Sequence, residues 1–218
     1  MSDGKMGMKI GESVFCIGYL LFDLIAGIIF LTRGVDRLFL LYGIMTLLLG
    51  SGDAFHLVPR VIKHMKGETP KVVWWMNLGL AVTSVTMTVF YIILFYIWKM
   101  MNPELILSGI VPVLIWTTAL ARILICLLPQ NRWFGEGNKK LSLCRNMIFA
   151  VTGAIEIILF ILSGGAFGVT MAVCIFLSFA FYIPVTLYAK ENPKIGMLMM
   201  PKTVMYIIIV SLGLSLLG

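Results

Sequence analysis

The chain has 218 residues, of which 60% are hydrophobic and only 12% are charged, and its mean hydropathy is +1.01. These values exclude an ordinary soluble domain, in which about a quarter of the residues are charged. The formal net charge of +7 resides mostly in short segments between apolar runs. This placement is typical of membrane topology signals and not of a nucleic-acid surface, so we expect an integral membrane protein without a nucleic-acid partner.

Seven apolar runs are each long enough to cross a hydrocarbon core of about 30 Å, which takes roughly 20 helical residues. They leave no room for a soluble domain. The chain is therefore predicted to be all-α, one integral membrane domain over 1–218 with about seven transmembrane helices. The first run lacks a small-residue cleavage site, so we expect a retained helix and not a signal peptide. The runs cover about 13–32, 38–58, 73–98, 105–128, 146–164, 167–188 and 196–217.

Most of the 17 basic residues lie on one side of these runs. Arg33, Arg37 and Lys99 lie on the other side, and Arg122 lies inside the fourth run. The positive-inside rule then places the N-terminus in the cytoplasm and the C-terminus outside a cell membrane that the chain crosses several times. The basic residues on the cytoplasmic side are Lys5, Lys9, Arg60, Lys63, Lys66, Lys71, Arg132, Lys139, Lys140, Arg145, Lys190, Lys194 and Lys202.

The second predicted helix carries a polar stripe. At 100° per residue five of its polar side chains fall within an arc of about 80°, while most of its leucines lie outside that arc. Each ionisable residue on a membrane helix is expensive and becomes a functional-site hypothesis. We expect this helix to kink or stop at Pro59, which has no backbone N–H to donate. The stripe consists of Tyr42, Thr46, Asp53, His56 and Arg60.

Other predicted helices bring ionisable residues to a similar depth. Counting about 1.5 Å per residue from the predicted helix ends places Asp53, Arg122 and Lys202 roughly 10 Å below the cytoplasmic surface. Two acids lie somewhat deeper and the histidine somewhat shallower. We name this set the charged layer; its members are Asp23, Asp53, His56, Arg122, Glu156 and Lys202.

Two interpretations of the charged layer follow. It is either a set of structural ion pairs, such as Asp53 with Arg122, or the wall of a polar cavity open to the cytoplasmic leaflet. In a cavity, Asp53 acts as general base on a water, His56 donates or relays a proton, and Arg122 binds phosphate. Glu156 is the third catalytic candidate. The other candidate substrate-binding residues are Asp23, Ser84, Tyr91, Tyr182 and Lys202.

The composition limits metals and cofactors. His56 and His64 are the only histidines, so a histidine-rich zinc site is not expected. An oxygen-ligand site built from Asp53, His56 and Glu156 is a weaker alternative. We predict no metal and no cofactor, and a membrane lipid or an amphipathic small molecule as partner. The same residues would also suit a small proton-coupled transporter or a ligand-sensing seven-helix protein.

Three segments resemble the lysoplasmalogenase family of polytopic membrane proteins. The segment LLLGSGDAFHLVPR is similar to the family's helix-end motif, in which Gly-Asp precedes apolar residues and Leu-x-Pro. The segment LGLAVTSVTMTVFYIILF places Ser84 and Tyr91 at matching positions, with Val85 near the family's histidine. The segment MAVCIFLSFAFYIP resembles the family's Ser-Asp helix, although Ser178 is followed by Phe179.

The resemblance implies a hydrolase that cleaves the vinyl ether bond of lysoplasmalogens with two membrane-embedded aspartates. Asp53 would be the first of them. The second has no matching residue, and Glu156 would have to replace it. The resemblance also implies eight membrane crossings, whereas seven runs are present here.

Overall fold

The computed structural model describes residues 3–189 and 191–217, so Lys190 lies outside the described residues. Within that part the chain forms α- and 3-10 helices joined by short connections. Seven of its helical segments are long and apolar enough to cross a membrane. The prediction of an all-α, multi-pass membrane protein is confirmed.

The helices are longer than most of the predicted spans, because polar residues at the membrane interface continue them. They are α1 (Asp3–Arg33), α2 (Arg37–Lys66), α3 (Pro70–Met101), α4 (Ile110–Leu127), α5 (Lys139–Ser163), α6 (Gly165–Tyr188) and α7 (Met199–Leu214), with 3-10 turns η1 (Pro129–Asn131), η2 (Pro193–Leu198) and η3 (Ser215–Leu217).

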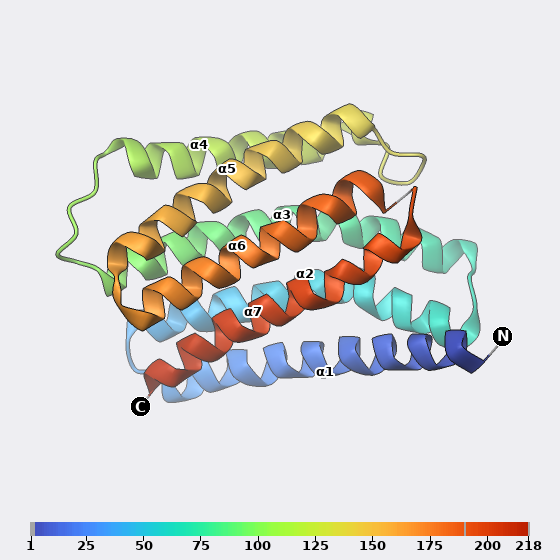
Figure 1. Cartoon of the computed structure of the whole chain (residues 1–218), viewed down its shortest axis with the longest axis horizontal. Helices are drawn as coiled ribbons and strands as arrows, with labels where there is room; N and C mark the ends of the chain where they lie inside the picture. Colours follow the sequence, from blue (N-terminus) through green and yellow to red (C-terminus); the bar gives the residue numbers. More distant parts are fainter. Residues whose placement is uncertain (1–2, 190, 218) are drawn as a thin grey trace.

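The helices pack in chain order, and α7 returns to pack against α1. Contacts of α3 with α5 and of α2 with α7 fill the interior. Figure 1 shows the N- and C-termini at opposite ends of this bundle, as an odd number of crossings requires. We name the end with the N-terminus the basic end; it also carries the connections α2–α3, α4–α5 and α6–α7 (Figure 1).

Local signals in the sequence set several helix ends. Thr69 caps α3 by accepting from the Val72 backbone N–H, and Asn138 caps α5 in the same way through Lys140 and Leu141. Gly164, with φ of 65°, ends α5 and joins it directly to α6. A residue with a side chain would be strained there.

We expected α2 to kink or stop at Pro59. It does not stop there, because α2 continues without a break to Lys66. Pro59 removes one helical donor and leaves the carbonyl of Phe55 without its usual partner. Membrane helices tolerate this loss when neighbouring groups compensate. The basic residues after Pro59 therefore extend the helix and do not form a loop.

Close packing between α2 and α3 depends on Gly79. A Cβ atom added at Gly79 would lie 2.5 Å from the backbone nitrogen of His56 and 2.6 Å from its Cα. These distances are shorter than any real Cβ contact, so a side chain would push the two helices apart. Gly79 thus fixes α3 against the helix that carries Asp53 and His56.

Trp98 joins α3 to α5 near the end opposite the basic end. Its side chain is fully buried, and its indole N–H lies 2.7 Å from the carbonyl oxygen of Leu159 and 2.6 Å from Oγ of Ser163. A buried indole N–H needs such an acceptor. The contact holds the two helices together at this point.

We predict that Gly79→Ala lowers the free energy of unfolding by about 1–3 kcal/mol, as overpacking does elsewhere. Gly18→Ala in α1 is the matched control, because nothing lies within 4 Å of its added Cβ. That control should gain about 0.5–1 kcal/mol from helix propensity. Thermal unfolding of both variants in detergent measures the difference. Equal melting temperatures would contradict the close approach.

Candidate functional site

The polar stripe of α2 faces the interior of the bundle. Tyr42, Thr46, Asp53 and His56 are all buried, with Asp53 9% and His56 7% exposed. Arg60 is half-buried near the basic end, where its Nη1 lies 3.2 Å from the Glu12 carboxylate. The helical periodicity therefore predicted the inward face of α2 correctly.

Asp53 lies at the centre of contacts from three helices. Its Oδ2 accepts a hydrogen bond from the Tyr19 hydroxyl of α1 at 2.8 Å. Lys202 of α7 is close enough for its charge to interact with Asp53. Asp23, one turn after Tyr19 on α1, also interacts electrostatically with Asp53. These contacts place Asp53 and Asp23 in the same part of the layer.

His56 has a defined orientation against α3. Its Nδ1 lies 3.2 Å from Oγ1 of Thr83, and that hydroxyl donates its own proton to the Gly52 carbonyl at 3.0 Å. When Thr83 donates to Gly52 it accepts from His56, and in that arrangement Nδ1 carries the imidazole proton. The Nε2 lone pair remains available for proton transfer.

Lys202 is buried and does not extend to the surface. It is 6% exposed, and its ammonium lies 4.8 Å above the ring of Tyr182 and 5.3 Å from the ring of Tyr206. Aromatic faces attract a desolvated cation. The Tyr182 hydroxyl in turn donates to Oδ1 of Asn146 at 2.9 Å. Two aromatic rings thus hold the Lys202 charge inside the layer.

Arg122 does not form the ion pair with Asp53 that one interpretation predicted. Its Nη1 donates to Oγ1 of Thr88 at 2.6 Å, and its guanidinium lies 3.5 Å above the Phe149 ring. Its Nε is buried without a hydrogen-bond partner in the described part of the chain. Arg122 therefore keeps a donor that can bind a ligand.

Two acids of the layer, Asp23 and Glu156, are 0% exposed. No described residue donates to the carboxylate oxygens of Glu156. The Tyr19 hydroxyl lies near enough to Asp23 to interact with it, but it donates to Asp53. Across residues 3–189 and 191–217, ion pairs form at the basic end: Arg60 and His64 with Glu12, Lys63 with Glu68, and Lys139 with Glu191. The two buried acids are therefore not members of these ion pairs.

Tyr91 of α3 interacts electrostatically with two members of the charged layer, Glu156 and Arg122. Its hydroxyl lies 3.4 Å from Oγ of Ser178. Ser84, by contrast, is not brought to Asp53. Its hydroxyl donates back to the Leu80 carbonyl of its own helix at 2.8 Å.

Asp53, His56 and Glu156 do not form a metal site. Among the described residues, no group of three His, Cys, Asp or Glu side chains is arranged to hold a metal ion. The oxygen-ligand alternative therefore has no geometric support.

Several functional neighbours were not predicted as site residues. Tyr19 binds Asp53, Thr88 binds Arg122 and Phe149 lies beneath Arg122. The signal for Tyr19 was its position one turn before Asp23, and for Thr88 its position four residues after Ser84 and three before Tyr91, on the same face of α3. Phe149 has no such signal, because an aromatic residue in a membrane helix is unremarkable.

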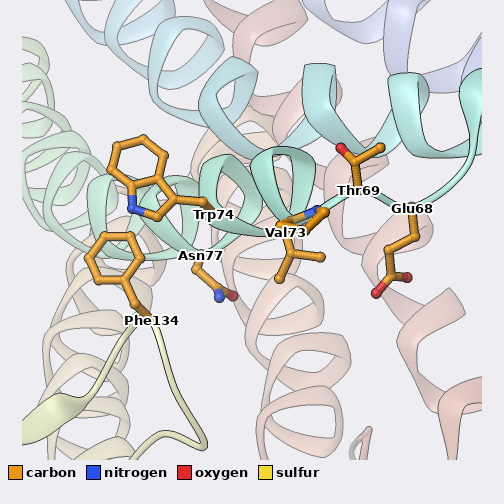
Figure 2. A pocket seen from close by; sticks show the side chains of 7 residues that line it. Glu68, Thr69, Val73, Trp74, Asn77 and Phe134 are labelled. Carbon is orange, nitrogen blue, oxygen red and sulfur yellow. The ribbon is translucent and has the colours of Figure 1, made fainter.

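Two of the hollows at the basic end of the bundle share Asn77 as a lining residue. One, of about 480 Å³, lies over the start of α3 and is lined by residues including Glu68, Thr69 and Asn77. Figure 2 shows Trp74 and Phe134 at one side of it and Glu68 at the other; the two rings are stacked with centroids 5.4 Å apart. The other, of about 340 Å³, is also lined by Asn77 and reaches Asn146, the partner of Tyr182.

Asp53 lines neither hollow. A polar cavity around Asp53 therefore stays a prediction.

We predict that Glu156→Gln changes the melting temperature by less than about 2 °C, because the variant replaces a carboxyl group that has no hydrogen-bond partner among the described residues with an amide of the same shape. Thr88→Val should lower the melting temperature by several degrees, because it removes the acceptor of the buried Arg122 guanidinium. Thermal unfolding in detergent compares the two variants. A large loss of stability in Glu156→Gln would show that the carboxyl group has a structural partner.

Comparison of the chain with protein-family models, with curated proteins and with solved structures finds no match. The resemblance to lysoplasmalogenases consequently rests on the three sequence segments alone.

Proposed function

We propose that this chain is a membrane-embedded hydrolase that acts on lysophospholipids, as its resemblance to lysoplasmalogenases implies, with Asp53 as the central acid–base residue. The observation that carries this proposal is the cluster of Tyr19, His56 and Lys202 around a buried Asp53. We also infer that the protein works in the cell membrane with its basic end in the cytoplasm.

The geometry suits Asp53 for the role of base. The Tyr19 hydroxyl donates to one oxygen of the Asp53 carboxyl group and so fixes its orientation, and the charge of Lys202 lies close enough to interact with it. Asp53 can take a proton from a water that adds to the vinyl ether carbon attached to oxygen. The oxygen of Asp53 that does not bind Tyr19 is the natural acceptor.

His56 completes the proton transfers. In its protonated form it gives the Nε2 proton to the substrate, and the Thr83 contact at Nδ1 holds the ring in place. Addition of water to the vinyl ether gives a hemiacetal, which breaks into an aldehyde and the glycerol hydroxyl. One water is consumed and no redox partner is needed. The unpartnered Nε of Arg122 provides a donor toward the phosphate.

We expect Asp53→Asn to reduce aldehyde release from lysoplasmalogen by at least about 100-fold, the usual contribution of a general base. The control is Asp36→Asn, the same chemical change in the exposed connection between α1 and α2. Purified protein in detergent and an aldehyde-coupled assay measure the rate, and thermal unfolding verifies the fold. Wild-type protein that releases no aldehyde, or full activity in Asp53→Asn, would refute the proposal.

The buried Glu156 supports a second candidate, a small proton-coupled transporter. A proton carrier needs a carboxyl group that can be neutral inside the membrane and charged when a water path opens. Glu156 fits this need because no described residue donates to its carboxylate oxygens. For this candidate, Glu156 and not Asp53 is the central residue.

In sealed vesicles that contain the protein, we expect a pH gradient to drive uptake of radiolabelled lysophosphatidylcholine if the carrier candidate holds. Glu156→Gln should abolish the dependence on the gradient while leaving the fold intact. Glu104→Gln, in the exposed connection between α3 and α4, is the matched control. Uptake that ignores the gradient in the wild type would exclude this candidate and leave the hydrolase proposal untouched.

A further inference from the structure

The hollow of about 340 Å³ at the basic end has an unusual lining. It lies between α3, the α4–α5 connection and the first turns of α5, with the end of α6 at its side. Arg132, Lys139 and Arg145 line it together with several side-chain amides, and no Asp or Glu is among its lining residues. Such a lining favours an anion that accepts several hydrogen bonds.

Arg145 is held in place before any ligand arrives. Its Nη1 donates to Oδ1 of Asn131 at 2.6 Å and its Nη2 to Oγ of Ser142 at 3.2 Å. Its guanidinium also lies 4.3 Å above the ring of Trp133. These contacts leave other N–H groups of the guanidinium unused, since it carries five donors. A fixed fork of this kind loses little entropy when it binds an oxyanion.

Arg132 adds a second guanidinium from a constrained turn. Its backbone φ is 50°, its N–H donates to Pro129 and its carbonyl accepts from Gly135. The side chains of Arg145 and Lys139 form hydrogen bonds or an ion pair with other described residues. No such side-chain contact is seen for Arg132 among the described residues. A non-glycine residue in the left-handed region is uncommon and persists where the surroundings fix it. Lys139 contributes less, because its ammonium already lies 3.6 Å from Glu191 at the surface.

The hollow is also connected with the charged layer. Asn146, a lining residue that is 8% exposed, accepts the hydrogen bond of Tyr182, and Tyr182 lies beneath Lys202. An anion in the hollow is thus separated from Lys202 by two side chains.

We propose that this hollow binds a phosphate group through Arg132 and Arg145. The phosphate belongs either to the head group of a membrane lipid or to a soluble phosphate ester that enters from the side of the basic end. This site is separate from Asp53, so its existence does not depend on hydrolysis or transport by the charged layer.

The test uses the full chain in a maltoside detergent, which contains no phosphate. Spin-labelled phosphatidic acid reports lipid binding by electron paramagnetic resonance, and spin-labelled diacylglycerol is the same lipid without the phosphate. Phosphatidic acid should bind and diacylglycerol should not. Arg132→Gln should weaken the binding by about tenfold, as expected when one charge-assisted hydrogen bond is lost.

Glycerol 3-phosphate distinguishes the two sources. If millimolar glycerol 3-phosphate displaces the labelled lipid, the site accepts a soluble phosphate ester; if it does not, the site requires the lipid head group. Both outcomes support the proposal. Arg37→Gln, which removes an exposed positive charge at the opposite end of the bundle, should leave binding unchanged.

Arg145→Gln is a weaker test, because Arg145 also supports Asn131 and Trp133 and its loss can disturb the fold. Arg132→Gln therefore decides the matter. Equal binding of the two labelled lipids, or an equal loss of binding in Arg132→Gln and Arg37→Gln, would overturn the proposal. Both results would mean that the lipid adheres through its chains or through general charge.

Discussion

The hydrocarbon core of a bilayer offers no water to a buried polar group, so each such group must find its partners within the protein. In this bundle, hydroxyl groups and aromatic rings meet that demand for the cations of the charged layer. Arg122 has Thr88 and Phe149, and Lys202 has Tyr182 and Tyr206. The acids are left out of ion pairs with these cations. The cations and acids of the layer therefore do not neutralise one another by direct contact. A ligand or a proton needs such groups to be available for binding.

The layer also divides into two parts with different character. Asp53 lies among α1, α2 and α7 with a hydroxyl donor and a nearby ammonium, and it suits acid–base chemistry. Glu156 lies on α5, and no described residue donates to its carboxyl group. Such a group suits a proton carrier, which gains or loses its proton only when water reaches it. Tyr91 interacts with Glu156 and with Arg122 and thereby places these two residues near one another. The two proposed functions thus rest on different residues of one layer.

The sequence predicted the coarse architecture well, because about 20 consecutive apolar residues have few alternatives to a membrane helix. It also predicted which face of α2 is buried, since that follows from a period of 3.6 residues. Helix ends were less accurate: hydropathy marks where hydrocarbon ends, whereas α1, α2 and α5 continue through polar interfacial residues. The depth of the charged residues could be counted along each helix. Their partners could not, because whether Arg122 meets Asp53 or Thr88 depends on how the helices are rotated and tilted against one another.

Trp98 has a mechanical consequence for any opening of the bundle. Its hydrogen bonds fasten α3 to α5 at the end opposite the basic end. Asn77, which lines both hollows, lies 21 residues earlier on α3, or about 30 Å away at 1.5 Å per residue. With one end fastened, α3 can separate from α5 only by pivoting, and a rotation of about 5° would move its other end by about 2.6 Å over that length. Over this length, a small angular change at Trp98 would become a displacement of a few ångströms at the basic end, while the fastened end would barely move.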